Sequence, residues 1–207
     1  RKSQIGLNLQ LRLSAASSPG SVMRMPLCRP VIACDDRAAV QAAMEAGWVS
    51  SAGPQLVEFE QHLGEYTGVA DVVVVSSGTA ALHLALTVSG IKPGDEVFVS
   101  DFNFAASAFA ASYCNAELSF VDCSTGDWNA DPSLVRDELV SRRLAGLPLP
   151  KALLLADIYG SLIARDRYLE LRDEFGLVIM EGAAEALGST WPDGSAAGTA
   201  GDLGCLS

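Results

Sequence analysis

The stretch VVVVSSGTAALHLAL, residues 72–86, decides the fold class of this chain. Its four valines favour an extended, buried strand, and the small residues 76–79 lead directly into a helical pattern. A strand, a tight turn and a helix in this order leave unpaired backbone N–H groups at the positive end of a helix dipole, which suits a phosphate. Gly78 lets the backbone come close, and Thr79 adds a hydroxyl donor. An ordinary strand–helix turn has the same pattern, and the dinucleotide fingerprint GxGxxG is absent.

Helical and strand-like segments alternate through the rest of the chain. Helices are expected over residues 35–46, 56–66, 80–89, 105–114, 132–145 and 165–175, and strands over 72–75, 96–100, 118–122, 152–157 and 177–181, with a last strand running through Leu206 and Ser207. Strands separated by helices predict right-handed βαβ units, and therefore an α/β, three-layer αβα fold with a mostly parallel sheet. Ligands of such sheets bind beyond the carboxyl ends of the strands. Those ends fall at 76–79, 100–104, 122, 157 and 181–185.

Composition excludes several classes of function. The chain has 207 residues and a net charge of −11, which argues against nucleic acid and anionic membranes as partners. Its five cysteines lack CxxC spacing and are typical of reduced thiols rather than of a disulfide framework or a zinc site. With two histidines, a histidine-rich metal centre is not expected. No run of 18 apolar residues is present, so no membrane span is expected.

The two ends of the chain differ in character from its middle. Residues 1–34 carry five basic residues and no acidic one, with a cluster of serines, so residues 1–24 are interpreted as a transit-like leader or a disordered tail. Translated non-coding sequence is a further alternative. Residues 25–207 would then hold the folded part, in the cytoplasm or, with a transit leader, in an organelle. Because the other end lies in an expected strand, we expect an N-terminal fragment.

The residues at the strand ends point to one kind of ligand. One end offers a phosphate cradle, a second offers the aromatic faces of Phe102 and Phe104, and a third offers Glu181 and Glu185. A flat, phosphorylated heteroaromatic molecule would use all three. Pyridoxal phosphate and flavin mononucleotide both fit, and the residue pattern alone leaves both open.

From about Met25 to Ser207 the sequence resembles the DegT-type pyridoxal-phosphate-dependent sugar aminotransferases, which have the aspartate-aminotransferase fold (fold type I). The resemblance rests on segments in family order, namely PLCRPVI, GWVSSAGPQLVEFEQHLGEYTG, SSGTAALHLAL, GDEVFVSDFNFAASAFAASYCNAELSFVD, KALLLADIYG, EGAAEALGS and GTAGDLGCLS. The opening GWVSSAG and the EALGS stretch are most similar to members that make 4-amino sugars on a UDP carrier, as in the bacillosamine and legionaminic acid pathways.

The resemblance implies roles for five residues in binding pyridoxal 5'-phosphate. Gly78 and Thr79 match the phosphate-binding turn, and Ser207 matches a serine that also holds the phosphate. Phe104 matches the aromatic residue that stacks on the pyridine ring, whereas Phe102 is expected to be a packing residue. Glu185 matches the residue near the phenolic oxygen of the cofactor.

The implied activity is amino transfer from an amino acid, glutamate by family analogy, to a keto group of a nucleotide-linked sugar, in an enzyme that is a homodimer. Two departures stand against it. The family's lysine, which forms the Schiff base, follows the position of Ser207 and so lies beyond this chain. Gly182 replaces the family aspartate that pairs with the pyridine nitrogen, and Glu181 should point to the opposite face of its strand. A catalytically dead pseudo-aminotransferase or a decayed reading frame, and a flavodoxin-like nucleotide binder, are the alternatives.

Overall fold

The computed structural model describes residues 29–207, so the predicted leader and its boundary at residue 25 lie outside the described residues. The chain divides into two units, and the boundary along the sequence falls between Gly47 and Trp48. The described part of the first unit contains α1 (Cys34–Glu45). Asp36 accepts a hydrogen bond from the amide of Ala33 at 2.7 Å, which caps the start of this helix.

The second unit is built around a five-stranded sheet in the order β2-β1-β3-β4-β5. The strands are β1 (Glu96–Ser100), β2 (Glu117–Val121), β3 (Ala152–Ala156), β4 (Val178–Gly182) and β5 (Leu203–Cys205), and each pairs with its neighbours in parallel. All five residues of β3 are buried, because this strand lies in the middle of the sheet with helices on both sides. The predicted parallel sheet is therefore confirmed.

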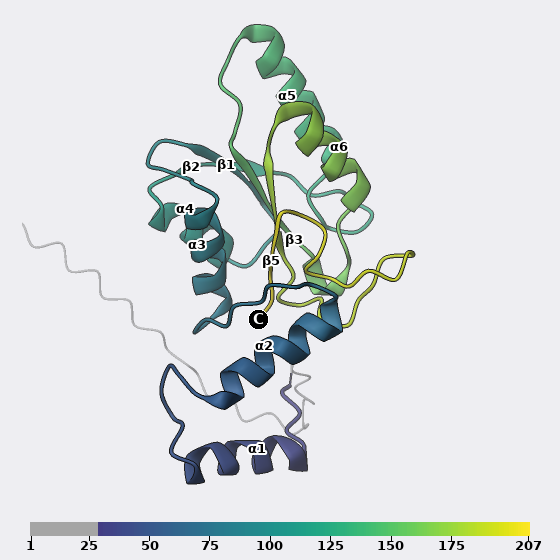
Figure 1. Cartoon of the computed structure of the whole chain (residues 1–207). Coiled ribbons are helices and arrows are strands. Elements are labelled where there is room, and N and C mark those ends of the chain that lie inside the picture. Colours follow the sequence, from purple (N-terminus) through teal and green to yellow (C-terminus); the bar gives the residue numbers. More distant parts are fainter. Residues whose placement is uncertain (1–28) are drawn as a thin grey trace, which may run out of the picture. The chain divides into compact units, whose positions relative to one another are not determined.

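Helices cover both faces of the sheet, as Figure 1 shows. One face packs against α3 (Gly78–Val88) and α4 (Ala106–Tyr113), through a core that includes Leu86, Val99, Ala110, Leu154 and Met180. The other face packs against α5 (Pro132–Ala145) and α6 (Arg165–Phe175), through a core that includes Phe98, Leu139, Leu153, Tyr168 and Ile179. The predicted three-layer αβα architecture is thus confirmed.

The ends of several helices follow from signals that are visible in the sequence. Asp131 caps α5 by accepting a hydrogen bond from the amide of Ser133 at 2.7 Å, and Pro132 occupies the first helical position. Gly146 ends the same helix with a φ of 68°, a conformation that favours glycine. Helix α2 (Pro54–Thr67) also begins at a proline and ends at a glycine, Gly68. The expected bounds of α5 and α6 match the structure.

Two strand predictions are wrong. The valines at 72–75 form no strand and join no ladder of the described sheet, and the amide of Val74 instead donates to Glu60 Oε1 at 2.9 Å. Their β-branched side chains favour an extended backbone, whereas a strand also needs a hydrogen-bonded partner. The last strand, β5, ends at Cys205 rather than running through Leu206 and Ser207.

Candidate cofactor-binding site

The predicted phosphate turn forms at the start of α3. The side chain of Ser77 accepts a hydrogen bond from the amide of Ala80 at 3.2 Å and so acts as the N-cap. The amides of Gly78 and Thr79 come next in the first turn, where a helix offers no partner of its own. No hydrogen bond to either amide occurs within the described part of the chain. These two N–H groups are available to an anion at the positive end of the helix dipole.

Ser207 lies directly against this turn. A Cβ placed on Gly78 would be 2.7 Å from Cβ and 3.0 Å from Oγ of Ser207, a separation that real Cβ atoms do not tolerate. The chain that leaves β5 therefore meets the start of α3 so closely that a side chain on Gly78 would force Ser207 or the turn to shift. The hydroxyl of Ser207 and the free amides of the turn share one small region. The structure brings together Gly78, Thr79 and Ser207, which the resemblance assigned to one phosphate.

Phe104 lies at the same carboxyl edge of the sheet, between β1 and α4. Its amide donates to Asn103 Oδ1 at 2.7 Å, and Asn103 Nδ2 donates to Ser107 Oγ at 2.7 Å, which fixes the entry to α4. The residue is 78% exposed, so most of its surface is open to solvent. An exposed aromatic ring at this edge is free to stack on a ligand, and its role toward a pyridine ring stays a prediction.

Glu185 follows β4, and one of its carboxylate oxygens is already hydrogen-bonded within the protein. Its Oε2 accepts a hydrogen bond from the amide of Tyr159 at 2.6 Å, which ties the exit of β4 to the exit of β3. Gly160 passes close by, since a Cβ there would be 3.2 Å from the carbonyl oxygen of Glu185. The predicted contact with the phenolic oxygen of a cofactor stays a prediction.

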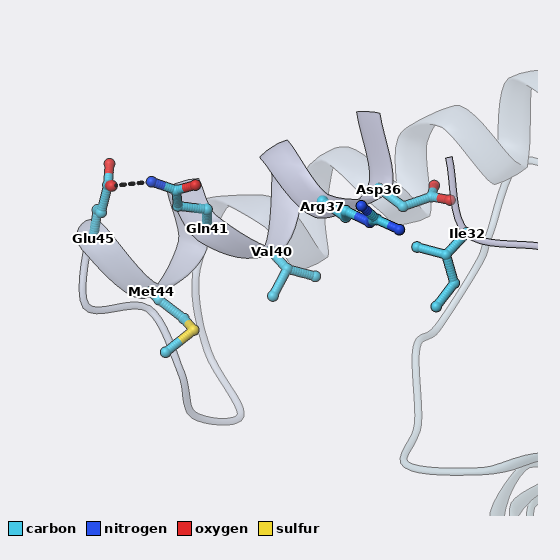
Figure 2. Close-up of a pocket in the computed structure, with 7 residues that line it drawn as sticks. All are labelled: Ile32, Asp36, Arg37, Val40, Gln41, Met44 and Glu45. Carbon is cyan, nitrogen blue, oxygen red and sulfur yellow. Dashed lines mark hydrogen bonds between the residues drawn. The ribbon is translucent and has the colours of Figure 1, made fainter. Parts of the chain in front are cut away.

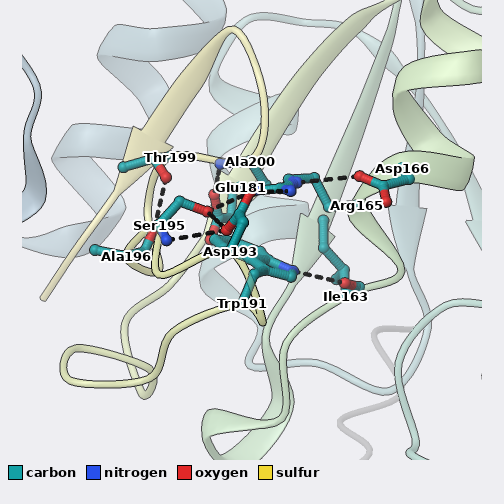
Figure 3. A network of polar contacts seen from close by, with 10 residues as sticks. All are labelled: Ile163, Arg165, Asp166, Glu181, Trp191, Asp193, Ser195, Ala196, Thr199 and Ala200. Carbon is teal, nitrogen blue, oxygen red and sulfur yellow. Dashed lines mark hydrogen bonds and ion pairs between the residues drawn. The ribbon is translucent and has the colours of Figure 1, made fainter.

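The two residues at the end of β4 face opposite layers, as the sequence predicted. Glu181 is fully buried and accepts hydrogen bonds from the amides of Gly198 and Ala200, each at 2.6 Å. Figure 3 shows this carboxylate among the residues of the following loop. A Cβ on Gly182 would instead be 3.1 Å from the carbonyl oxygen of Leu155 and 4.0 Å from the side chain of Leu82 in α3. Both carboxylate oxygens of Glu181 are therefore hydrogen-bonded to this loop, so Glu181 cannot supply the carboxylate that Gly182 lacks.

Asp157 lies directly after β3, at one of the strand ends where a ligand is expected, but the sequence indicates no role for it. Asp157 is 2% exposed, and its Oδ1 accepts a hydrogen bond from the amide of Ile163 at 2.9 Å, whereas Oδ2 has no partner among the described residues. Burial, followed by the nearby Glu181, raises the pKa of Asp157 to about 8. Asp157 is therefore mostly protonated at neutral pH. The sequence does contain a signal for this buried acid, because Asp157 directly follows the wholly apolar run of residues 152–156.

The two described lysines lie away from this edge. Lys92 precedes β1, and Lys151 precedes β3 and pairs with Asp95 at 2.7 Å. Both are at the amino edge of the parallel sheet, opposite Gly78 and Ser207. Within residues 29–207, no three or more His, Cys, Asp and Glu residues gather as metal ligands do. None of the helices in that range has the length and apolar character that a membrane crossing requires.

A separate hollow lies along α1 and is shown in Figure 2. Ile32, Val40 and Met44 give it an apolar wall, with Asp36 and Arg37 at one end. All of its lining residues belong to the first unit. It holds none of the residues predicted to bind a cofactor and no cluster of reactive groups, so it is not the candidate site.

A parallel sheet covered by helices, with a glycine turn and a serine close together at its carboxyl edge, is the architecture of an α/β protein whose ligands bind beyond that edge. The model of the DegT/DnrJ/EryC1/StrS aminotransferase family matches residues 30–207, and this chain belongs to that family. The family and the fold class expected from the sequence are both confirmed. The narrower resemblance to members that use UDP-linked sugars stays a prediction.

Individual relatives agree with this assignment. The GDP-perosamine synthase of Caulobacter vibrioides is 35% identical over 184 residues, which are 89% of this chain and 47% of that protein. A DegT DnrJ EryC1 StrS aminotransferase from Brucella abortus is 32% identical, with a TM-score of 0.72 over 78% of this chain and 43% of that one. Spr1654 from Streptococcus pneumoniae, solved in its PLP form, is 27% identical, with a TM-score of 0.73 over 86% of this chain and 47% of that one. The chain thus spans less than half the length of these relatives.

Proposed function

We propose that this chain forms the phosphate-binding half of a pyridoxal 5'-phosphate site, in an enzyme that transfers an amino group from an amino acid to a keto group of a nucleotide-linked sugar. The observation that carries the proposal is the contact between Gly78 and Ser207 at the start of α3. Next to this contact, the amides of Gly78 and Thr79 have no hydrogen-bond partner among the described residues, and the hydroxyls of Thr79 and Ser207 would add two further donors to one phosphate. The relative that makes GDP-perosamine supports a nucleotide-linked sugar as the class of substrate.

The residues of this chain would hold and orient the cofactor. The turn at Gly78 binds its phosphate, the exposed ring of Phe104 covers one face of the pyridine, and Glu185 lies toward its phenolic oxygen. When bound, pyridoxal phosphate supplies the electron sink that amino transfer requires. With both described lysines at the amino edge of the sheet, the catalytic lysine has to come from outside residues 29–207.

A second candidate function is supported by Gly182. The position faces α3 and the carboxyl edge, and it offers no carboxylate to a pyridine nitrogen, while Glu181 is bound to Gly198 and Ala200. The second candidate function is therefore that of a pseudo-aminotransferase, which binds the cofactor but does not transfer amino groups.

We also propose a homodimer. Several large apolar side chains on the outer surfaces of α3 and α4 are exposed, namely Leu84, Val88, Phe109 and Tyr113. Exposed apolar surface of this kind is typical of a protein–protein interface. Light scattering on the full-length protein should give twice the mass of one chain, and a monomer would contradict this part of the proposal.

The experiment that tests the function uses the full-length protein with pyridoxal phosphate and glutamate. Absorbance should show stoichiometric cofactor binding and then conversion to pyridoxamine phosphate, and mass spectrometry should detect an amino sugar once a nucleotide-linked keto sugar is added. Cofactor binding without conversion would favour the pseudo-aminotransferase. Absence of cofactor binding would contradict both candidates.

A further inference from the structure

Three aromatic side chains come together at the carboxyl edge of the sheet. The ring of Phe102, after β1, lies 5.4 Å from that of Trp128 and 6.3 Å from that of Tyr159, measured between centroids. Trp128 comes from the loop between β2 and α5, and Tyr159 from the short helix η1 (Ile158–Gly160) after β3. The three rings are 40%, 55% and 67% exposed in that order. Phe102 was expected to be a packing residue, but it forms the centre of this exposed aromatic cluster.

Two of the three rings are held in place by strained backbone. Trp128 has a φ of 66° and Tyr159 a φ of 51°, the left-handed region that costs a non-glycine residue about 1–2 kcal/mol. The buried Asn129 joins the two loops, because it accepts a hydrogen bond from the amide of Ile158 at 3.0 Å and donates one to the carbonyl of Ser161 at 2.9 Å. Strain of this kind persists where the surrounding structure enforces it, and it gathers at ligand-binding sites.

The charges around the cluster restrict what it can bind. The loops that surround it, residues 101–105, 122–131, 157–164 and 183–190, contain no lysine or arginine. Asp101, Asp122 and Glu185 are exposed on them. Carboxylates accept hydrogen bonds from hydroxyl groups and repel a diphosphate. The cluster therefore favours a neutral ring that carries hydroxyl groups.

The order of the strands sets the position of the cluster relative to the phosphate turn. Ser207 follows β5, and Tyr159 follows β3, two strands further along the sheet. Neighbouring strands are about 4.8 Å apart, so the cluster begins roughly 10 Å from the phosphate turn along the same edge. This edge can therefore hold a phosphate near β5 and, about two strands away, a second molecule against the aromatic cluster.

We infer that the cluster of Phe102, Trp128 and Tyr159 is the subsite for the hexose ring of the nucleotide-linked sugar, with the apolar face of the hexose on the aromatic rings and its hydroxyls toward the neighbouring carboxylates. This inference rests on the proposed function. It also implies that the diphosphate of the substrate is held outside these loops, since they carry no cation.

The test is saturation-transfer difference NMR on the full-length protein, with UDP-glucose and GDP-mannose as probes. The variants are Trp128→Asn and Tyr159→Asn, because asparagine tolerates the left-handed backbone and removes the ring. Leu144→Asn is the control, since Leu144 is also a large exposed apolar residue but lies near the end of α5 at the opposite edge of the sheet, outside both the aromatic cluster and the proposed dimer surface. The temperature of unfolding and the mass in light scattering are recorded for every variant.

We expect the hexose protons of both probes to be saturated more strongly than the base protons. Each of the two variants should lower hexose saturation roughly 3- to 10-fold, as expected for loss of one aromatic contact. Neither should lower the unfolding temperature, and Leu144→Asn should leave the spectra unchanged. Unchanged hexose saturation in both variants, or none in the parent protein, would overturn the inference.

Two further readouts distinguish a hexose subsite from a dimer interface and from a failure of the proposed function. A lower mass for Trp128→Asn and Tyr159→Asn would overturn the inference, because the cluster would then be an interface between two copies of the chain. The binding measurement needs no cofactor, so a failure of the proposed function is seen separately in the titration with pyridoxal phosphate. If that titration and amino transfer succeed while the hexose signals do not depend on the cluster, the inference alone fails.

Discussion

Gly78 and Ser207, far apart in the sequence, are in contact at the carboxyl edge of the sheet, and a methyl group on Gly78 would lie 2.7 Å from Cβ of Ser207. The contact joins the start of α3 to the chain that leaves β5. It favours glycine in the turn at residues 76–79, because Ser207 occupies the space that a larger side chain at residue 78 would need. The backbone conformation of Gly78 is not left-handed, so φ does not impose this preference.

Gly78→Ala is predicted to weaken cofactor binding. The added methyl forces Ser207 or the turn to move, and overpacking of this kind costs about 1–3 kcal/mol, so affinity for pyridoxal phosphate should fall roughly 5- to 100-fold. Cofactor titration of the full-length protein measures this. Gly126→Ala is the matched control, since a Cβ at Gly126 meets nothing within 4 Å. Equal affinity for both variants would show that the contact does not shape the site.

Thr79→Val should also weaken cofactor binding, for a different reason. Valine keeps the shape of the side chain but removes a hydroxyl donor to a charged phosphate. Such hydrogen bonds contribute about 1.5–3 kcal/mol, which is roughly a 10- to 100-fold change in affinity. Thr79→Ser retains the hydroxyl and should bind almost normally in the same titration. The assignment fails if valine and serine at this position bind the cofactor equally well.

Gly182→Asp is predicted to increase the rate at which glutamate converts the bound cofactor. A carboxylate there would stabilise the protonated pyridine, and an electrostatic contact made mainly in the transition state contributes about 2.7–4 kcal/mol, or roughly 100- to 1,000-fold in rate. The position is tight, with a Cβ 3.1 Å from the carbonyl oxygen of Leu155, so a small shift is required.

Single-turnover absorbance measures the effect of Gly182→Asp, and Gly182→Asn is the control for size without charge. Faster conversion in the aspartate variant alone supports the electrostatic role. If the asparagine variant is accelerated equally, charge on the pyridine is not the cause.

The raised pKa of Asp157 predicts that the folded protein loses stability as pH rises. Its pKa is about 8 in the folded protein, because of burial and then Glu181, against about 3.9 in an unfolded chain. The folded state therefore binds the additional proton between pH 4 and 8. The stabilisation is fully present below pH 4 and is lost as pH rises to 8.

Asp157→Asn imitates the protonated side chain at every pH. Its free energy of unfolding, from urea titrations, should increase relative to the parent protein as pH rises from 4 to 8. Asp137→Asn, a change of the same kind on the exposed surface of α5, should follow the parent protein. A constant difference between Asp157→Asn and the parent across this range would contradict the raised pKa.

The sequence predicts those parts of the structure that depend on nearby residues. The bounds of α5 follow from Asp131, Pro132 and Gly146, and the turn at Gly78 follows from small residues before an apolar helix. The valines at 72–75 show the limit, because their composition favours a strand whereas the structure gives them no ladder partner in the described sheet. Pairing depends on residues that are distant in the sequence.

The parts of the site that could not be predicted from the sequence also depend on contacts between residues that are distant along the chain. The approach of Ser207 to Gly78 was expected only through resemblance, and the grouping of Phe102, Trp128 and Tyr159 was not expected. Each ring follows a different strand, so no spacing along the chain reports their contact. The left-handed backbone of Trp128 and Tyr159 is equally invisible, because neither residue type favours it.

The most direct test of the central claim is a crystal structure of the full-length protein with pyridoxal 5'-phosphate. We predict that the phosphate lies within hydrogen-bonding distance of the amide of Gly78 and of the hydroxyls of Thr79 and Ser207. A phosphate bound elsewhere, with only solvent at the start of α3, would contradict the assignment of this turn.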